Sequence, residues 1–185
     1  MKKLIASREE LEEICKRIGA QITEDCKKEE KVPVILGVMK GCLNFMMDLL
    51  KYVECPIYTD FIQIASMAGV KSTGKVSLLR DLAVDVKDRL VIIVEDVVDT
   101  GISMDYLVTH MQEKFKAKEV RVCTLFNKTA SRKIDVPIFY EGKRLEHDDF
   151  LLGYGLDYYE FERNVPYVYT PTKEEIDHFD ELAKK

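Results

Sequence analysis

The segment VIIVEDVVDTGISM, at positions 91–104, gathers side chains that could do chemistry. Four apolar residues lead into Glu95 and Asp96, and Asp99 follows after two valines. Carboxylates can hold a divalent cation, accept hydrogen bonds from a sugar diol or remove a proton from a substrate. A threonine, a glycine and a serine come next, so hydroxyl donors and a flexible backbone position lie beside the acids.

The triplet Asp99-Thr100-Gly101 also occurs in the active sites of aspartic proteases, but its context here differs. Aspartic proteases are all-β, and no helix follows their triplet. Here a buried strand is predicted before the triplet, and the apolar residues of 104–111 recur at helical spacing after it. At such a junction, free backbone N–H groups and the positive helix end form an anion site. With hydroxyl donors from Thr100 and Ser103, the segment suits a phosphate monoester.

The acids need a different partner, because three carboxylates repel a bare phosphate. Glu95 and Asp96 can bind a sugar diol, or hold Mg²⁺, which usually takes one or two carboxylates with waters and substrate phosphates. Asp99 remains available as a base. A ligand with a 5-phosphate, a ribose diol and a metal-bound pyrophosphate would use every part of the segment. The alternative is a solvated acidic loop with a helix cap; the combination between a buried strand and a helix favours the binding site.

Periodicity along the chain predicts an α/β fold, an open and mostly parallel twisted sheet flanked by helices, in one domain that spans 1–185. Nearly all-apolar runs, typical of strands buried on both faces, alternate with amphipathic segments that indicate helices. Ser7 and Glu10 are spaced as a capping box for the first helix. The predicted elements are a helix at 8–27, a strand at 31–39, a helix after 41, a strand at 56–66, a loop at 67–75, a short returning strand, a strand at 90–94, a helix from 103 and a strand at 119–126.

The tail differs from the rest of the chain. Residues from about 134 to 170 hold six of the nine tyrosines and several short strand-like pieces. We expect this stretch to form a small C-terminal hood on the sheet rather than a separate domain. Thr172 and Glu175 are spaced as a second capping box, which predicts a last helix.

Composition narrows the classes of protein that fit. The chain has 185 residues, of which 46% are apolar and 33% charged, as is ordinary for a globular protein. Its net charge of -5 argues against nucleic-acid binding by bulk charge, and no window is apolar enough to span a membrane. Five cysteines without a CxxC pair indicate reduced thiols and a cytoplasmic protein. We therefore expect neither a nucleic-acid nor a membrane partner.

The acidic segment at 95–101 resembles the phosphoribosyl pyrophosphate signature of type I phosphoribosyltransferases, and most closely that of the hypoxanthine-guanine phosphoribosyltransferases. Three further blocks resemble the same family. GVMKG (37–41) is similar to its pyrophosphate loop, FIQIAS…STG (61–74) to its flexible lid and FLLGYGLDYYEFER (150–163) to its purine-binding hood. Four ordered blocks are far more specific than any one of them, and the resemblance extends over most of the chain.

The resemblance implies roles around the sugar. Glu95 and Asp96 would meet the ribose hydroxyls and, directly or through water, Mg²⁺. Asp99 would lie near purine N7 and take the proton of the base. Backbone amides would cradle the 5-phosphate, and these belong to Thr100, Gly101, Ile102 and Ser103.

The resemblance also implies roles around the pyrophosphate. The Lys40 backbone would bind it together with Gly41, and the Met39–Lys40 peptide would be cis. Arg163 would reach it with a planar fork of donors that suits two oxygens. The lid would include Ser66 and Met67, where the family commonly has Ser-Tyr. Methionine has no hydroxyl, so the closing contact of the lid differs here.

For the purine, the resemblance implies contacts at three places. Lys128 would contact the 6-oxo group, which selects against adenine because a 6-amino group offers donors to a cation that can only donate. Phe150 would stack on the ring, and the backbones of Leu151 and Asp157 would read its far edge. The implied reaction is purine salvage: a Mg²⁺-dependent transfer of 5-phosphoribosyl from phosphoribosyl pyrophosphate to N9 of hypoxanthine, and of guanine, by a homodimer or homotetramer.

Two alternatives stay open. One is the same chemistry on another base, such as xanthine or a pyrimidine. The other is a regulator that keeps the fold as a ligand sensor and binds nucleic acid. Such a regulator could lose its base or its pyrophosphate loop, whereas this chain has Asp99, Lys40 and Arg163 and a negative net charge. The enzyme is therefore favoured.

Overall fold

The computed structural model describes residues 2–66, 76–80 and 82–185. In chain order, the elements are β1 (Lys3–Ala6), α1 (Arg8–Cys26), β2 (Val34–Met39), α2 (Leu43–Leu50), β3 (Tyr58–Ser66), β4 (Val76–Arg80), β5 (Leu90–Val98), α3 (Ile102–Glu113), β6 (Glu119–Lys128), β7 (Ile138–Leu145), β8 (Val168–Thr170) and α4 (Lys173–Leu182). None of the helices within these described ranges is both long and apolar enough to cross a lipid bilayer.

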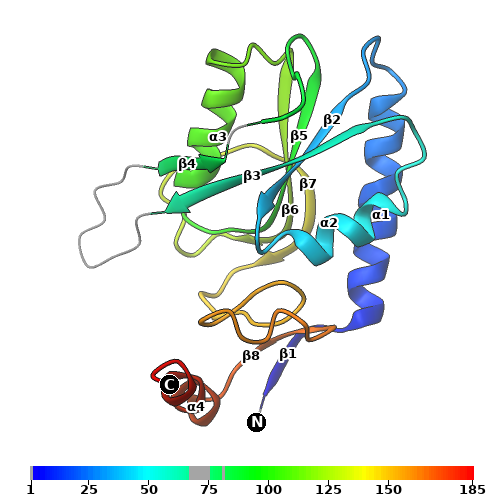
Figure 1. Ribbon diagram of the computed structural model, residues 1–185. Coiled ribbons are helices and arrows are strands. Elements are labelled where there is room, and N and C mark those ends of the chain that lie inside the picture. The colour runs from blue at the N-terminus through cyan, green and yellow to red at the C-terminus, as the bar shows by residue number, and fades with distance from the viewer. Residues whose placement is uncertain (1, 67–75, 81) are drawn as a thin grey trace.

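A mixed sheet forms the centre of the molecule, in the order β4-β3-β2-β5-β6-β7 (Figure 1). β2 pairs in parallel with β3 and β5, and β6 pairs in parallel with β5 and β7. β4 returns antiparallel beside β3. The predicted open, mostly parallel α/β sheet is confirmed, together with its short returning strand.

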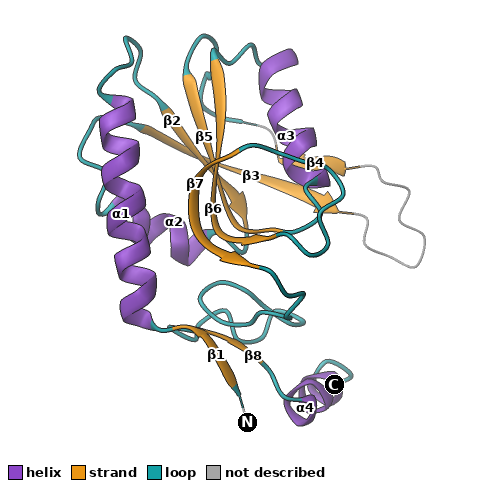
Figure 2. Ribbon diagram, turned by 180° about the vertical axis from the view of Figure 1, so that it is seen from behind, coloured by secondary structure: helices purple, strands orange, loops and turns teal. Residues whose placement is uncertain are grey.

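The two faces of the sheet carry separate apolar cores. Along β5, Leu90, Ile92 and Val94 pack in the core shared with α1 and α2. Val91 and Ile93 pack in the core shared with α3. This alternation is that of a strand buried on both faces. Figures 1 and 2 show α1 and α2 on one side of the sheet and α3 on the other, so the loops at the carboxyl ends of the strands remain at the edge where ligands of such sheets bind.

A small second unit contains both ends of the chain. β1 and β8 pair antiparallel in a two-stranded sheet. Leu152 bridges Tyr169 on β8, and both pack with Phe179 of α4 in a third apolar cluster. Figure 1 shows this unit beyond one end of the main sheet, with the N- and C-termini close to each other.

One segment that the sequence assigned to the hood belongs to the main sheet. β7 pairs in parallel with β6, from Val122 opposite Ile138 to Lys128 opposite Leu145. Its sequence, IFYEGKRL, has no apolar run, because β7 lies at the edge of the sheet and is only partly buried. Edge strands often carry polar side chains of this kind, which resemble a surface loop. The hood therefore begins after β7, and the name is used below for residues 146–170.

Side chains cap two helices as the sequence predicts. The Ser7 hydroxyl accepts a hydrogen bond from the backbone N–H of Glu10 at 3.2 Å, at the start of α1. At the start of α4, Thr172 and Glu175 form a full capping box, in which each side chain accepts from the backbone N–H of the other. Each cap satisfies backbone donors that the first helical turn leaves without partners.

Candidate functional site

The loop after β2 and the acids at the end of β5 form one surface. The Met39–Lys40 peptide is cis, as expected. A Cβ added to Gly41 would lie only 1.9 Å from Oδ2 of Asp96, so the carboxylate faces the Gly41 backbone directly and would have to move for any larger residue. The predicted pyrophosphate loop and the predicted acid pair are therefore brought together.

The acid pair has the chemistry of a cation site. Burial, the charge of Asp96 and a hydrogen bond between the two carboxyls raise the pKa of Glu95 well above its ordinary value. Two neighbouring carboxylates repel each other unless a proton or a cation lies between them. Among the described residues, no group of three or more His, Cys, Asp or Glu side chains could hold a metal ion. Two carboxylates still suit Mg²⁺, which fills its other positions with water and phosphate oxygens.

Asp99 lies in a cavity of ≈ 270 Å³ that also includes Glu95, Thr100, Gly101 and Ser103 in its lining. Oδ1 of Asp99 is buried and has no hydrogen-bond partner within the described part of the chain. A buried carboxylate oxygen without a partner is unfavourable by about 1–3 kcal/mol, so a donor that reached it would stabilise the site. The proposed base and the phosphate cradle thus share one cavity.

The cradle is a tight turn from β5 into α3. Gly101, the N-cap of α3, has φ 83°, which favours glycine. A Cβ on Gly101 would meet the carbonyl oxygen of Ile134 at 2.2 Å. The Ile134 N–H donates to the Thr100 carbonyl at 3.0 Å, so the chain after β6 holds the cradle from behind. The first-turn N–H groups of α3 lack helical acceptors and can bind an anion.

Lys128, the last residue of β6, carries a buried ammonium group between two acids. Its Nζ lies 3.7 Å from Oδ2 of Asp99 and 2.5 Å from Oδ1 of Asp148. Phe150 follows Asp148 by two positions, is 46% exposed and meets Tyr158 edge to face at a centroid distance of 5.6 Å. The structure thus brings Lys128 and Asp99 together and leaves the Phe150 ring partly open. Leu151, the next residue, is buried.

Arg163 is linked to the predicted pyrophosphate loop through Glu160 of the hood. Its Nη2 lies 2.7 Å from Asp157 and its Nε lies 3.1 Å from Glu160, whose carboxylate is also 3.1 Å from Nζ of Lys40. A Cβ on Gly155 would lie 2.2 Å from the Gly41 carbonyl oxygen. The hood therefore packs directly on the loop. The Asp157 side chain holds Arg163, a contact that the sequence does not reveal.

Comparison with known proteins decides the family. A family model described as the phosphoribosyl transferase domain matches residues 5–159. The chain belongs to this phosphoribosyltransferase family. It is 37% identical over 171 residues to a hypoxanthine-guanine phosphoribosyltransferase of Staphylococcus epidermidis, which covers 92% of this chain and 93% of that one. The predicted resemblance is confirmed.

Solved structures agree with the sequence comparison. A hypoxanthine phosphoribosyltransferase of Staphylococcus aureus superposes with a TM-score of 0.87 and 35% identity, covering 95% of this chain and 94% of that one. A hypoxanthine-guanine phosphoribosyltransferase of Bacillus anthracis gives a TM-score of 0.85 and 34% identity, covering 93% of this chain and 99% of that one. Both cover nearly the whole chain, hood included.

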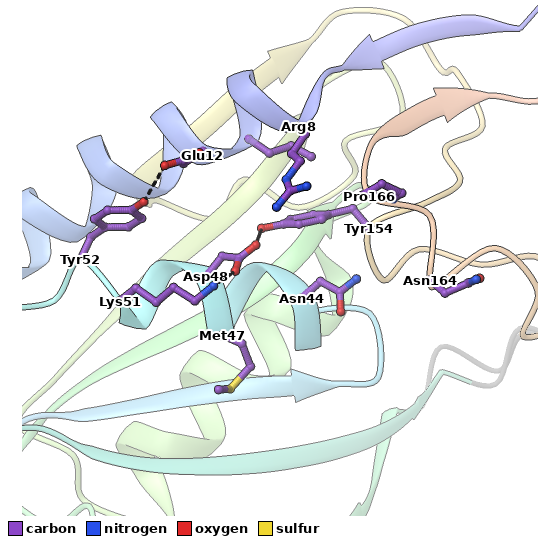
Figure 3. A pocket seen from close by; sticks show the side chains of 11 residues that line it. Arg8, Glu12, Asn44, Met47, Asp48, Lys51, Tyr52, Tyr154, Asn164 and Pro166 are labelled. Carbon is purple, nitrogen blue, oxygen red and sulfur yellow. Dashed lines mark hydrogen bonds and ion pairs between the residues drawn. The ribbon is translucent and has the colours of Figure 1, made fainter.

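A larger cavity of this phosphoribosyltransferase, ≈ 520 Å³, lies away from that site between α1, α2 and the hood. Figure 3 shows the Tyr154 hydroxyl pointing to Asp48, to which it donates a hydrogen bond at 2.6 Å. Arg8 and Lys51 also line the cavity, so both charge signs are present. Within the described residues, the lining includes none of the predicted site residues. The larger volume of this cavity therefore does not identify it as the predicted site. The hydrogen bond between Tyr154 and Asp48 in its wall links the hood to α2.

One predicted site residue lies outside the described structure, and three residues near the site were not predicted. Ser66 ends the backbone of β3, whereas Met67 lies outside the described residues, so the predicted lid is not placed. Conversely, Asp148 and Arg132 contact site residues, and Asn127 contacts Arg132, although the sequence did not single these three out. Each stands outside the four blocks that resemble the family, and no periodic pattern marks them. Their positions follow from chain segments that meet only in the fold.

Proposed function

We propose that this phosphoribosyltransferase transfers the 5-phosphoribosyl group of phosphoribosyl pyrophosphate to N9 of hypoxanthine, and of guanine, releasing IMP or GMP and pyrophosphate. The observation that carries the proposal is the carboxyl group of Asp99. Its Oδ1 is buried without a partner in the described structure, and its Oδ2 lies 3.7 Å from Lys128. A proton acceptor thus lines the same cavity as the phosphate cradle and lies next to a cation.

Asp99 removes the proton that makes a purine a poor nucleophile. As the bond from N9 to anomeric C1 forms, the bond from C1 to the pyrophosphate oxygen breaks, and the proton on N7 moves to Asp99. Positioned proton transfer of this kind contributes about 10²–10⁴-fold in rate. Positive charge builds up at C1 as pyrophosphate leaves, and the carboxylates of Glu95 and Asp96 stabilise it.

Lys128 reads the 6-oxo group of the purine. An ammonium group can only donate, so it accepts hypoxanthine, guanine or xanthine and rejects the 6-amino group of adenine. Phe150 stacks on the ring; it is 46% exposed and follows by two positions Asp148, the ion-pair partner of this lysine. The backbones of Leu151 and Asp157 read the far edge. A xanthine preference is the second candidate, since backbone contacts at that edge discriminate weakly among 6-oxopurines.

The remaining groups hold the phosphates. The 5-phosphate is bound by Thr100, Gly101, Ile102 and Ser103. Pyrophosphate is bound by the Lys40 backbone, Gly41 and Arg163. Mg²⁺ bound by Glu95 and Asp96 supplies charge neutralisation for pyrophosphate. A lid that includes Ser66 and Met67 and assembly as a homodimer or homotetramer remain predictions from the resemblance, and a cytoplasmic location remains a prediction from the cysteines.

The first test offers five bases singly to the protein with phosphoribosyl pyrophosphate and Mg²⁺, and compares kcat/KM. We expect turnover of hypoxanthine and guanine, with adenine and uracil unreactive. A clear preference for xanthine would support the second candidate. No turnover of any base would contradict the proposed reaction and favour the ligand-sensor alternative, which binding of phosphoribosyl pyrophosphate without turnover would identify.

The second test replaces Asp99 by asparagine, which keeps the shape of the side chain and removes the proton acceptor. We expect kcat to fall by about 10²–10⁴-fold. Binding of phosphoribosyl pyrophosphate, measured by calorimetry, should stay close to that of the wild type, because Asp99 does not hold the phosphates. An unchanged kcat would show that another group removes the proton.

A further inference from the structure

We propose that Arg132 is a positioning residue that sets the placement of Asp99 relative to Lys128. The inference rests on the proposed function, because these two side chains are its proton acceptor and its reader of the 6-oxo group. Nε of Arg132 donates to the Asp99 carbonyl at 2.8 Å. Its Nη2 donates to the carbonyls of Val98 at 3.2 Å and Lys128 at 3.0 Å.

Arg132 links the two chain segments just beyond the last residue pair of the β5–β6 ladder. The parallel pairing of β5 and β6 ends with Val98 opposite Asn127. Asp99 and Lys128 are the next residues on the two strands, so no further ladder pair links them. One guanidinium group spans the gap by binding carbonyl groups on both chains. The distance of 3.7 Å between Oδ2 of Asp99 and Nζ of Lys128 therefore depends on this bridge.

Buried polar groups hold the guanidinium in place. The side-chain oxygen of Asn127 accepts from Nη2 of Arg132, and the amide nitrogen of Asn127 donates to Glu141 on β7. Asn127 is only 4% exposed. Because Asn127 is desolvated, losing either partner would leave a buried polar group unpaired, which favours one geometry of the network. Arg132 is thus tied to three strands at once.

The aliphatic part of Arg132 adds a packing contact. A Cβ on Gly101 would lie 3.2 Å from Cδ of Arg132, so the arginine stem covers the backbone of the phosphate cradle. Only a planar fork of several donors can reach three carbonyl groups from one side chain. Lysine offers a single ammonium group and cannot bridge both strand ends in this way.

The experiment compares Arg132→Lys and Arg132→Ala with the wild type for kcat, KM and base discrimination. The matched control is Arg89→Lys. Arg89 also bridges two backbone carbonyls, those of Val32 at 2.9 Å and Asp85 at 3.1 Å, but next to the start of β5, at the other end of the strand from Asp99. Both substitutions remove a guanidinium bridge, so the control accounts for a general loss of stability.

We expect kcat for hypoxanthine to fall by about 10²-fold in Arg132→Lys, because a displacement of about 1 Å in a reacting group can have that effect. KM for phosphoribosyl pyrophosphate should change little. The ratio of kcat/KM for hypoxanthine to kcat/KM for adenine should fall. Added guanidinium ion should partly restore kcat of Arg132→Ala. Arg89→Lys should lose stability without these changes.

Each other outcome has a definite meaning. An active wild type with unchanged kcat and base preference in Arg132→Lys would overturn the inference and leave the proposed function intact. A rise in KM for phosphoribosyl pyrophosphate at constant kcat would also overturn it, since Arg132 would then bind phosphate. An inactive wild type would contradict the proposed function itself. If the Arg132 variants do not fold, Asn127→Ser decides: it keeps Arg132 but removes the side-chain acceptor that orients its guanidinium group, and an unchanged kcat would overturn the inference.

Discussion

At the scale of single residues, the site depends on two close approaches to glycine backbones. Gly41 lies against the carboxylate of Asp96, where an added Cβ would be 1.9 Å from Oδ2. Gly101 has φ 83° and lies against the chain that follows β6. In both places a glycine brings backbone N–H groups within reach of a phosphorylated ligand. The carboxylates at the end of β5 and the backbones of Gly41 and Gly101 therefore form one proposed binding surface.

This contact predicts the effect of Gly41→Ala. The new methyl group would push the Asp96 carboxylate away from the loop and so disturb the proposed Mg²⁺ site. We expect the Mg²⁺ concentration for half-maximal activity to rise by about 10-fold or more, as for other disturbed metal ligands. Titration of activity with Mg²⁺ measures it.

A second glycine provides the control for that variant. A Cβ on Gly19 would lie 2.6 Å from Cβ of Tyr52, where α1 meets the end of α2. Gly19→Ala should therefore lower the melting temperature without changing the Mg²⁺ requirement. Coincident Mg²⁺ curves for Gly41→Ala and the wild type would contradict the placement of the metal beside Asp96.

At the scale of elements, burial decides which parts the sequence reveals. β2 and β5 are buried on both faces, so their apolar runs predict them directly, and the acids at the end of β5 follow. β1 is short and pairs with β8, which is far away in the sequence, whereas β7 is a polar strand at a sheet edge, next to the preceding strand β6. Sequence patterns do not reveal Arg132 and Asp148 either, because their contacts form only when the strand ends meet in the fold.

The link between the hood and α2 leads to a prediction on stability. The Tyr154 hydroxyl donates to Asp48 at 2.6 Å, and Tyr154 is 6% exposed. Tyr154→Phe removes the donor of a charge-assisted hydrogen bond, so we expect the free energy of unfolding to fall by about 1–2 kcal/mol. Urea denaturation followed by circular dichroism measures it.

Tyr52 serves as the matched control. Its hydroxyl also donates to a carboxylate, Glu12, at 3.0 Å, but this contact is exposed to solvent. Tyr52→Phe should therefore lower the free energy of unfolding by less than Tyr154→Phe does. Equal losses for the two variants would show that burial of the Tyr154 contact does not strengthen the link between α2 and the hood.

At the scale of the whole molecule, the sheet and its two cores protect most of the thiol groups. Burial raises the pKa of Cys15 to about 11 and that of Cys26 to about 12. Burial also raises the pKa of Cys42 and Cys123. Cys55, between α2 and β3, is partly exposed. The thiolate is the reactive form, so the buried thiols should be inert in the folded protein.

Alkylation tests this protection. With iodoacetamide near pH 7.5, we expect Cys55 to react first in the folded protein and the other four thiols to react only after unfolding in urea. Peptide mass spectrometry at increasing times identifies the modified positions. Alkylation of Cys15 or Cys42 at the rate of Cys55 would show that the two cores open more readily than their packing indicates.

The pairing of β1 with β8 joins the first and last parts of the chain. During translation, β1 leaves the ribosome before the other strands of the fold, and its partner β8 emerges after them. The main sheet has all its strands before then, because β7 ends at Leu145. Pairs so distant in sequence close slowly, since the loop between them must be ordered first. We therefore expect the main sheet to assemble before the unit that contains β1 and β8.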